Sequence, residues 1–62
     1  MKRTQLLKFL KREGCVLYRE GKRHTVFWNS VDNKTSTVPR HIEIDDFLAR
    51  KICRDLGIKS IK

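Results

Sequence analysis

Cysteine, proline and glycine are scarce in this sequence, and their scarcity excludes several kinds of site. The two cysteines, Cys15 and Cys53, form no CxxC pair, and no further residues complete a zinc-binding pattern. A disulfide between them is an open alternative, but we expect reduced, buried thiols, as in a cytoplasmic protein. With three glycines and one proline, the chain has no glycine-rich nucleotide-binding loop and no linker rich in these residues.

Long apolar runs are also missing, which argues against a membrane protein. No segment approaches the roughly 20 apolar residues that span a bilayer, and no strongly amphipathic basic helix is evident. The opening segment, MKRTQLLKFLKREG, is charged throughout and lacks the uninterrupted apolar core of a secretory signal. We therefore expect a cytoplasmic protein with no membrane partner.

Acidic residues are few, and the charge balance is strongly positive. Seven Asp and Glu stand against fifteen Lys and Arg, which gives a formal net charge of +8. Such an excess makes a polyanion the expected partner, and nucleic acid fits it best. An acidic protein partner and a merely solubilising surface charge are the alternatives. The carboxylates form no paired site for acid–base chemistry, because Asp32 lies in a predicted turn and Glu43, Asp45 and Asp46 lie near a predicted helix start.

Apolar and turn-forming residues divide the chain into helices and strands within a single domain, residues 1–62. Helices are predicted over 4–14 and 45–57, and strands over 15–20, 24–29 and 35–38. The predicted helix caps are Thr4 and Asp45 at the starts and Gly14 and Gly57 at the ends. Because the turns between the strands are short, the strands should form an antiparallel meander.

The predicted fold class is therefore α+β. Its order is α-β-β-β-α, with a three-stranded antiparallel sheet and two helices on one face. A sheet this small needs one face covered, and both helices carry apolar stripes that can cover it. This is the architecture of double-stranded-RNA-binding domains, although a fold alone does not define a function. The segment 24–29 carries apolar groups on both of its faces, so the pattern does not show which face meets the helices.

His24, in the stretch EGKRHTVFWN, is the best candidate for chemistry. Histidine has an ordinary pKa of about 6.5, so a neutral imidazole is available at pH 7 to accept a proton. A base that deprotonates the 2′-hydroxyl of RNA starts an internal attack on the neighbouring phosphorus, and nearby cations stabilise the developing charge. That reaction needs no metal and no cofactor. The alternative is that His24 is an ordinary surface residue at a strand end.

Cations and aromatic residues elsewhere are candidates for RNA contacts. The predicted phosphate ligands are Lys22, Arg23, Arg19, Lys34 and Arg40. The candidates for stacking on unpaired bases are Trp28, Tyr18 and Phe27, although core packing is the stronger expectation for Phe27. His41, in VPRH, is either a loop residue that hydrogen-bonds to the backbone or a second group for phosphate contact or proton transfer.

Several segments, taken together, resemble the HicA family of bacterial toxin ribonucleases. They are LLKFLKREG, then GKRHTVF as a Gly-x-x-His-x-x-aromatic motif, then TSTVPRH, EI and LARKICRDLGI. Each segment is weak alone, but their order, their spacing and the length of the chain make the set specific. The resemblance covers nearly the whole chain.

The resemblance implies a double-stranded-RNA-binding-like fold and metal-independent cleavage of messenger RNA. It also implies an inhibitory partner, an antitoxin of the HicB family, and it makes His24 the catalytic histidine. Many members of the family have Gly-Ser directly before this histidine, whereas this chain has Lys22 and Arg23. The departure leaves the histidine in place and puts side-chain cations where the usual small residues stand.

The predicted function is that of the toxin component of a type II toxin–antitoxin system. The toxin would be an endoribonuclease that cleaves mRNA with His24 in proton transfer. One alternative is a non-catalytic RNA-binding module of the same fold, which would bind RNA without cutting it. The other is a basic protein-interaction domain for an acidic partner, which would show no affinity for RNA at moderate salt.

Overall fold

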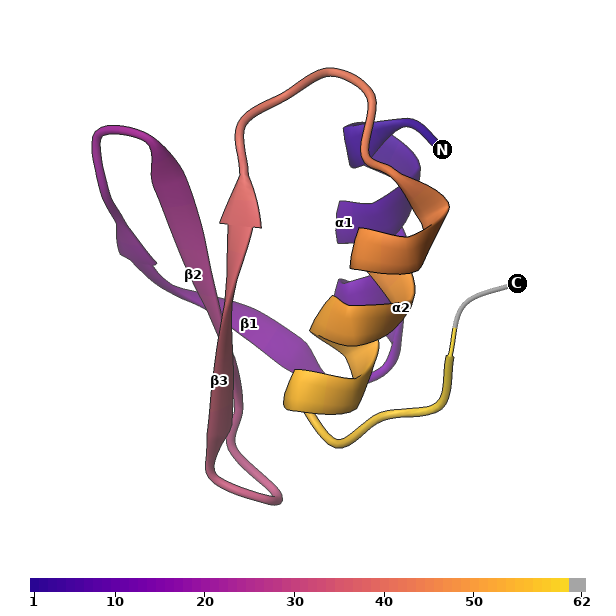
Figure 1. The fold of residues 1–62 in the computed structure, drawn as a ribbon. Coiled ribbons are helices and arrows are strands. Elements are labelled where there is room, and N and C mark those ends of the chain that lie inside the picture. The colour runs from indigo at the N-terminus through magenta and orange to yellow at the C-terminus, as the bar shows by residue number, and fades with distance from the viewer. Residues whose placement is uncertain (61–62) are drawn as a thin grey trace.

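The computed structural model describes residues 1–60, in which two helices pack on one face of a three-stranded sheet (Figure 1). The elements are α1 (Arg3–Arg12), β1 (Cys15–Glu20), β2 (His24–Asn29), β3 (Lys34–Pro39) and α2 (Asp46–Asp55). The strands are antiparallel in the order β1-β2-β3, so β2 is central and the other two are edge strands. The predicted fold class, element order and sheet are confirmed.

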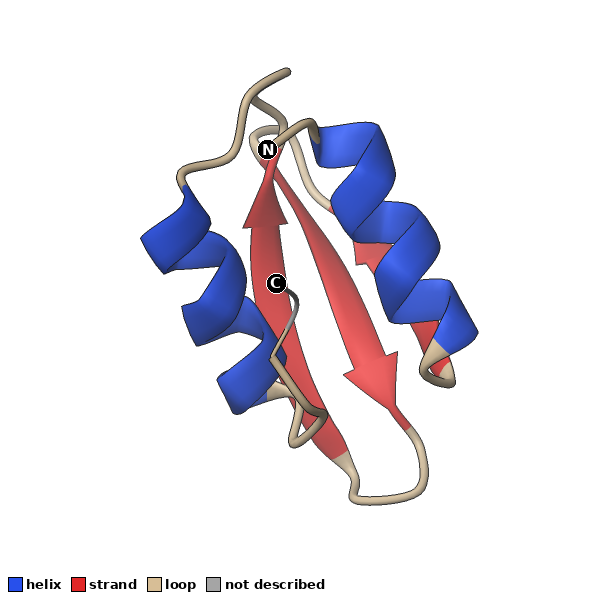
Figure 2. Ribbon diagram, turned by 90° about the vertical axis from the view of Figure 1, so that its right-hand side faces the viewer, coloured by secondary structure: helices blue, strands red, loops and turns tan. Residues whose placement is uncertain are grey.

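The core lies between the sheet and the two helices, which run side by side across it (Figure 2). Helix α1 packs against β1 and helix α2 against β3. The buried core residues are Leu6, Leu10, Cys15, Phe27, Val38, Ile44, Ala49, Ile52, Cys53 and Leu56. Phe27 is only 2% exposed, so the expectation that it packs in the core is confirmed.

Within residues 1–60, no helix is both long enough and apolar enough to cross a membrane.

Alternation along β2 shows which face of the sheet meets the helices. The buried side chains are Thr25, Phe27 and Asn29, and those on the opposite, open face are His24, Val26 and Trp28. Asn29 can be buried because its Nδ2 donates to the carbonyl of Leu56 at 2.7 Å. Two of the three positions that face the helices are thus polar, which explains why the sequence pattern did not distinguish the faces.

The pairing of β1 with β2 contains a β-bulge. Leu17 pairs with Phe27, but Arg19 pairs with Val26, so Tyr18 is an extra residue on β1. A bulge bends its strand and increases the local twist, which is well tolerated on an edge strand. Beyond the bulge, the register of β1 is shifted by one residue.

Helix α1 begins differently from the prediction. Lys2 is its N-cap and Thr4 lies inside the first turn, so the prediction that Thr4 caps the helix is wrong. The amide of Arg3 donates to the carbonyl of Ile42 at 2.9 Å, and Lys2 forms an antiparallel bridge with Glu43. A contact with a segment about 40 residues away therefore helps to fix this helix start, together with a local bond in which the amide of Lys2 donates to Oε1 of Gln5 at 3.4 Å.

The other predicted helix ends are confirmed. Asp45 caps α2, and its Oδ2 accepts from the amide of Leu48 at 3.3 Å. Gly14 and Gly57 follow the two helices with φ values of +92° and +74°. Side chains rarely adopt such left-handed backbone, so glycine is the favoured residue at both places.

The two cysteines lie in the core as thiols. Cys15 begins β1 and Cys53 lies on α2, and both are buried. Burial raises the pKa of the Cys15 thiol above its ordinary value, and the neighbouring Cys53 and Glu13 raise it further. The expected burial of both cysteines is therefore confirmed.

Candidate functional site

His24 is the first residue of β2 and lies on the open face, at the end of the sheet closed by the β1–β2 loop. The amide of Gly21 donates to the carbonyl of His24 at 2.8 Å, which closes the loop of residues 21–23. On its other side, His24 pairs with Pro39 of β3. The backbone of His24 is thus held by the β1–β2 loop on one side and by β3 on the other, while its side chain is exposed to solvent.

Three of the predicted phosphate ligands lie around His24. Lys22 and Arg23 precede it directly in the exposed loop. Arg19 pairs with Val26, two residues beyond His24 on the same face, so Arg19 and His24 are diagonal neighbours. Diagonal neighbours on antiparallel strands lie about 7–8 Å apart, within reach of an arginine side chain. The open face thus carries a histidine among cations.

Lys34 does not join this group. It pairs with Asn29 at the far end of β2, whereas His24 pairs at the near end. Five residues of strand separate the two positions, which corresponds to about 17 Å. Lys34 also pairs with a helix-facing residue, and its side chain approaches Gly57 after α2. The structure therefore separates Lys34 from the candidate histidine.

Arg40 is bound to the β1–β2 loop. Its Nη2 donates to Oε1 of Glu20 at 2.9 Å and to the carbonyl of Gly21 at 2.7 Å. The same Glu20 oxygen accepts from the hydroxyl of Thr25 at 2.7 Å, and that hydroxyl accepts from Nη2 of Arg3 at 2.9 Å. Arg40, predicted as a phosphate ligand, thus belongs to a network that fixes the loop before the candidate histidine.

Arg3 is the cation of this network that the sequence reasoning missed. Its Nε donates at 2.9 Å to the carbonyl of Pro39, the residue that pairs with His24. One signal could have drawn attention to it. A cation in the first turn opposes the helix dipole, and the first turn of α1 holds no acidic residue to offset it. Its position beneath β3 is a tertiary property, which the local sequence does not contain.

An aromatic pair occupies the open face next to Val26. The rings of Tyr18 and Trp28 lie 5.9 Å apart between centroids, tilted by 52°. Trp28 is fixed by its Nε1, which donates to Oδ1 of Asn33 at 3.1 Å, and Tyr18 is 63% exposed. Exposed, oriented rings beside cations are the arrangement on which unpaired bases stack. Tyr18 lies on the open face because it is two residues from Val16, which pairs with Trp28 on that face.

His41 and the carboxylates add no second centre. His41 is exposed in the loop between β3 and α2, and within residues 1–60 its side chain forms no hydrogen bond, so it does not bind the backbone. In the same part of the chain, no three His, Cys, Asp or Glu side chains gather where they could hold a metal ion. His24 is therefore the histidine that cations surround.

The fold and this face define a small, basic α+β domain with a double-stranded-RNA-binding-like architecture and an exposed histidine among cations. A family model described as the HicA toxin of bacterial toxin–antitoxin matches residues 3–58 of the 62-residue chain. The chain belongs to this family and is the toxin of a toxin–antitoxin system, so an antitoxin is its expected partner. No curated protein and no solved structure matches the chain.

Proposed function

We propose that this toxin is a metal-independent endoribonuclease that cleaves mRNA and is inhibited by an antitoxin of the HicB type. The observation that carries the proposal is the exposure of His24 on the open face, with Lys22, Arg23 and Arg19 around it. A cationic surface attracts the phosphodiester backbone, and an accessible imidazole accepts a proton near neutral pH.

The proposed reaction is an internal transesterification. The imidazole of His24 takes the proton of a 2′-hydroxyl, whose oxygen forms a bond to the adjacent phosphorus. The bond from phosphorus to the 5′-oxygen breaks, that oxygen takes a proton from water as the strand leaves, and the imidazolium of His24 gives its proton back to the solvent. The products are a 2′,3′-cyclic phosphate and a free 5′-hydroxyl. Arg19, Lys22 and Arg23 stabilise the negative charge that develops on the phosphoryl oxygens.

The aromatic pair supports a single-stranded substrate. Unpaired bases expose their faces, so they can stack on Trp28 and Tyr18 while the backbone follows the cations. A duplex keeps its bases stacked internally and offers no such contact. An acidic antitoxin that covers this face would block the histidine and be attracted by the same charges.

Cleavage of a labelled RNA in the presence of a chelator tests the proposal. We expect the parent chain to cut, and His24→Ala to reduce the rate by about 10²–10⁴-fold while it leaves folding and RNA binding intact. His41→Ala is the matched control, because it removes the other histidine and should keep most of the activity. A 2′-deoxy nucleotide at the cut position should abolish cleavage. Equal rates for His24→Ala and the parent would reject this assignment.

The alternative with structural support is an RNA-binding module without catalysis. The aromatic pair and the cations would serve binding equally well, and His24 would then be one further polar contact. In that case the purified chain binds RNA with a steep salt dependence but produces no cyclic phosphate end. A basic protein-interaction domain would instead bind no RNA at moderate salt.

A further inference from the structure

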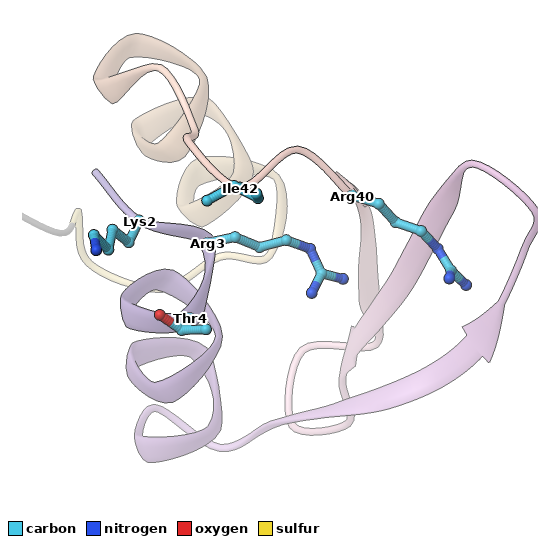
Figure 3. Close-up of a pocket in the computed structure, with 5 residues that line it drawn as sticks. All are labelled: Lys2, Arg3, Thr4, Arg40 and Ile42. Atoms are coloured by element: carbon cyan, nitrogen blue, oxygen red, sulfur yellow. The ribbon is translucent and has the colours of Figure 1, made fainter.

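An open cleft of about 350 Å³ lies on the helix side of the sheet, between the start of α1 and the segment after β3 (Figure 3). Its walls are formed by Lys2, Arg3, Thr4, Arg40 and Ile42. Every ionisable residue of this lining is a cation. The positive charge of the lining suits the binding of an anion. Of the residues that the sequence predicts to contact RNA or to take part in catalysis, only Arg40 belongs to this lining.

The cations of this cleft form a row. In Figure 3, the side chains of Arg3 and Arg40 both extend toward the β1–β2 loop, and the side chain of Lys2 extends the opposite way from the start of α1, so Lys2 marks one end of the row and Arg40 the other. A single small anion is best held by donors that converge on one point. A row of separate cations instead suits a chain with successive charges, such as the phosphates of a nucleic acid strand.

Few carboxylates form ion pairs with the cations of this row. Among residues 1–60, the only carboxylate in an ion pair with a residue of the lining is that of Glu20, which binds Arg40. Glu43, which bridges to Lys2 through the backbone, has its carboxylate 3.6 Å from the amine of Met1. In that part of the chain, residues 1–60, neither Lys2 nor Arg3 is therefore in an ion pair, although Arg3 donates hydrogen bonds to Pro39 and Thr25.

The row leads to the candidate histidine. Arg3 donates to the carbonyl of Pro39, and Pro39 pairs with His24. Arg40 follows Pro39 in the chain and contacts Gly21 of the β1–β2 loop. Because β3 is an edge strand, a polymer on the open face can pass over its end at Pro39 and enter the cleft without crossing the sheet.

We propose that this cleft is a subsite for the RNA strand that flanks the scissile bond, with Lys2 and Arg3 on its phosphates. The proposal rests on the proposed function, because it assigns the cleft to the same substrate. Ile42, which is 80% exposed, supplies an apolar surface for the ribose or base between two phosphates. The aliphatic stems of the two arginines extend that surface.

The subsite is tested by measuring RNA binding by the Lys2→Ala variant at several salt concentrations. Every protein in the experiment also carries His24→Ala, so that the RNA probe is not cleaved. The probe is a single-stranded RNA long enough to extend on both sides of the open face. Loss of one phosphate contact should reduce the magnitude of the slope of log K against log salt by about 0.7 and weaken binding. Lys11→Ala is the matched control, since it removes an exposed lysine from the far end of α1, and its slope should equal that of the parent.

Two additions sharpen the experiment. Arg3→Lys keeps the charge but removes part of the hydrogen-bonding fork, so it should weaken binding without a change in slope. Shortening the probe from one end only should remove the difference between Lys2→Ala and the parent, because only one flank of the strand reaches the cleft.

The outcomes separate the subsite from the proposed function. Equal slopes and affinities for Lys2→Ala and Lys11→Ala, with normal binding by the parent, would overturn the subsite alone. Weaker binding of the antitoxin by Lys2→Ala with unchanged RNA binding would make the cleft a protein contact and overturn it too. Failure of every variant to bind RNA would reject the proposed function itself.

Discussion

Arg40 and Gly21 are joined across 19 residues of chain by a hydrogen bond of 2.7 Å from the Nη2 of the arginine to the carbonyl of the glycine. Gly21 also donates its amide to the carbonyl of His24. The two bonds at Gly21 connect the segment after β3, the β1–β2 loop and the candidate histidine. The position of the imidazole therefore depends on an arginine that lies 16 residues later in the sequence.

Replacing Arg40 should loosen this loop without unfolding the protein. Its ion pair with Glu20 is about half exposed on both sides, so we expect Arg40→Ala to cost at most about 1 kcal/mol of stability. Amide hydrogen exchange at Gly21 and His24 should accelerate, and cleavage should fall by more than the loss of stability explains. Lys51→Ala, which breaks the similarly exposed ion pair with Asp55, is the control. It should change neither the amide exchange at Gly21 and His24 nor the rate of cleavage. Unaltered exchange in Arg40→Ala would show that the loop is held by other contacts.

Asn29 should be the most sensitive polar residue of the core. It is 4% exposed, and its side chain joins the carbonyl of Leu56 to the amide of Val31. Asn29→Ala leaves the Leu56 carbonyl without its donor, so we expect a loss of about 1–3 kcal/mol. Thermal unfolding should show a decrease in Tm of roughly 4–8 °C per kcal/mol in a domain of this size.

The neighbour of Asn29 offers a matched control. Ser30 is exposed, and Ser30→Ala should change stability by less than about 0.5 kcal/mol. Asn29→Asp retains an acceptor for Val31 but removes the donor to Leu56 and adds a buried charge, so it should be at least as destabilising as alanine. A fully stable Asn29→Asp variant would contradict this assignment.

Cys15 should react slowly with alkylating reagents in the folded protein. Burial raises the pKa of its thiol, so less of the reactive thiolate is present at a given pH than for an ordinary cysteine. The raised pKa of this thiol also determines how the stability of the protein changes with pH. The contribution of this thiol to the free energy of unfolding is fully present below its pKa in the unfolded state. It is lost as the pH rises through the higher pKa of the folded state. Unfolding monitored against pH should therefore show a weaker alkaline decline in Cys15→Ala than in the parent.

Trp28 should report directly on RNA. It is the only tryptophan of the chain, so the intrinsic fluorescence comes from the open face. Stacking of a base should quench it, and Tyr18→Ala should weaken binding more than Tyr18→Phe, because phenylalanine keeps the ring. Binding of RNA with unchanged fluorescence would mean that the bases do not reach this pair.

The sequence predicted the elements well where local chemistry decides them. Strands β1 and β2 begin and end at the predicted residues, because glycines and β-forming side chains delimit them. Strand β3 is one residue longer at each end than predicted. The predicted start of α1 was wrong because Lys2, which is not a usual capping residue, is the N-cap and a backbone contact with Ile42, far along the chain, holds this end of the helix.

The site was predictable only in part. His24 and the two cations before it are neighbours in the sequence, so their proximity needs no fold. The face of the sheet that His24 occupies was not predictable, because buried hydrogen bonds to Thr25 and Asn29 outweigh the apolar pattern of the strand. The role of Arg3 and the separation of Lys34 both follow from pairing between strands and helices, which no local pattern contains.

The bulge at Tyr18 determines whether a positive or a negative side chain of β1 lies beside His24 on the open face. In an uninterrupted ladder, Glu20 would lie opposite His24 on the open face, and Arg19 would turn toward the helices. The inserted residue exchanges these two positions: the arginine comes to the open face and the carboxylate joins Thr25 and Arg40 behind it. A strand that kept all its residues but lost the bulge would therefore put a carboxylate beside the histidine in place of the guanidinium. Deletion of Tyr18 would instead remove the extra residue, leave Arg19 opposite Val26 and keep the field that attracts phosphate.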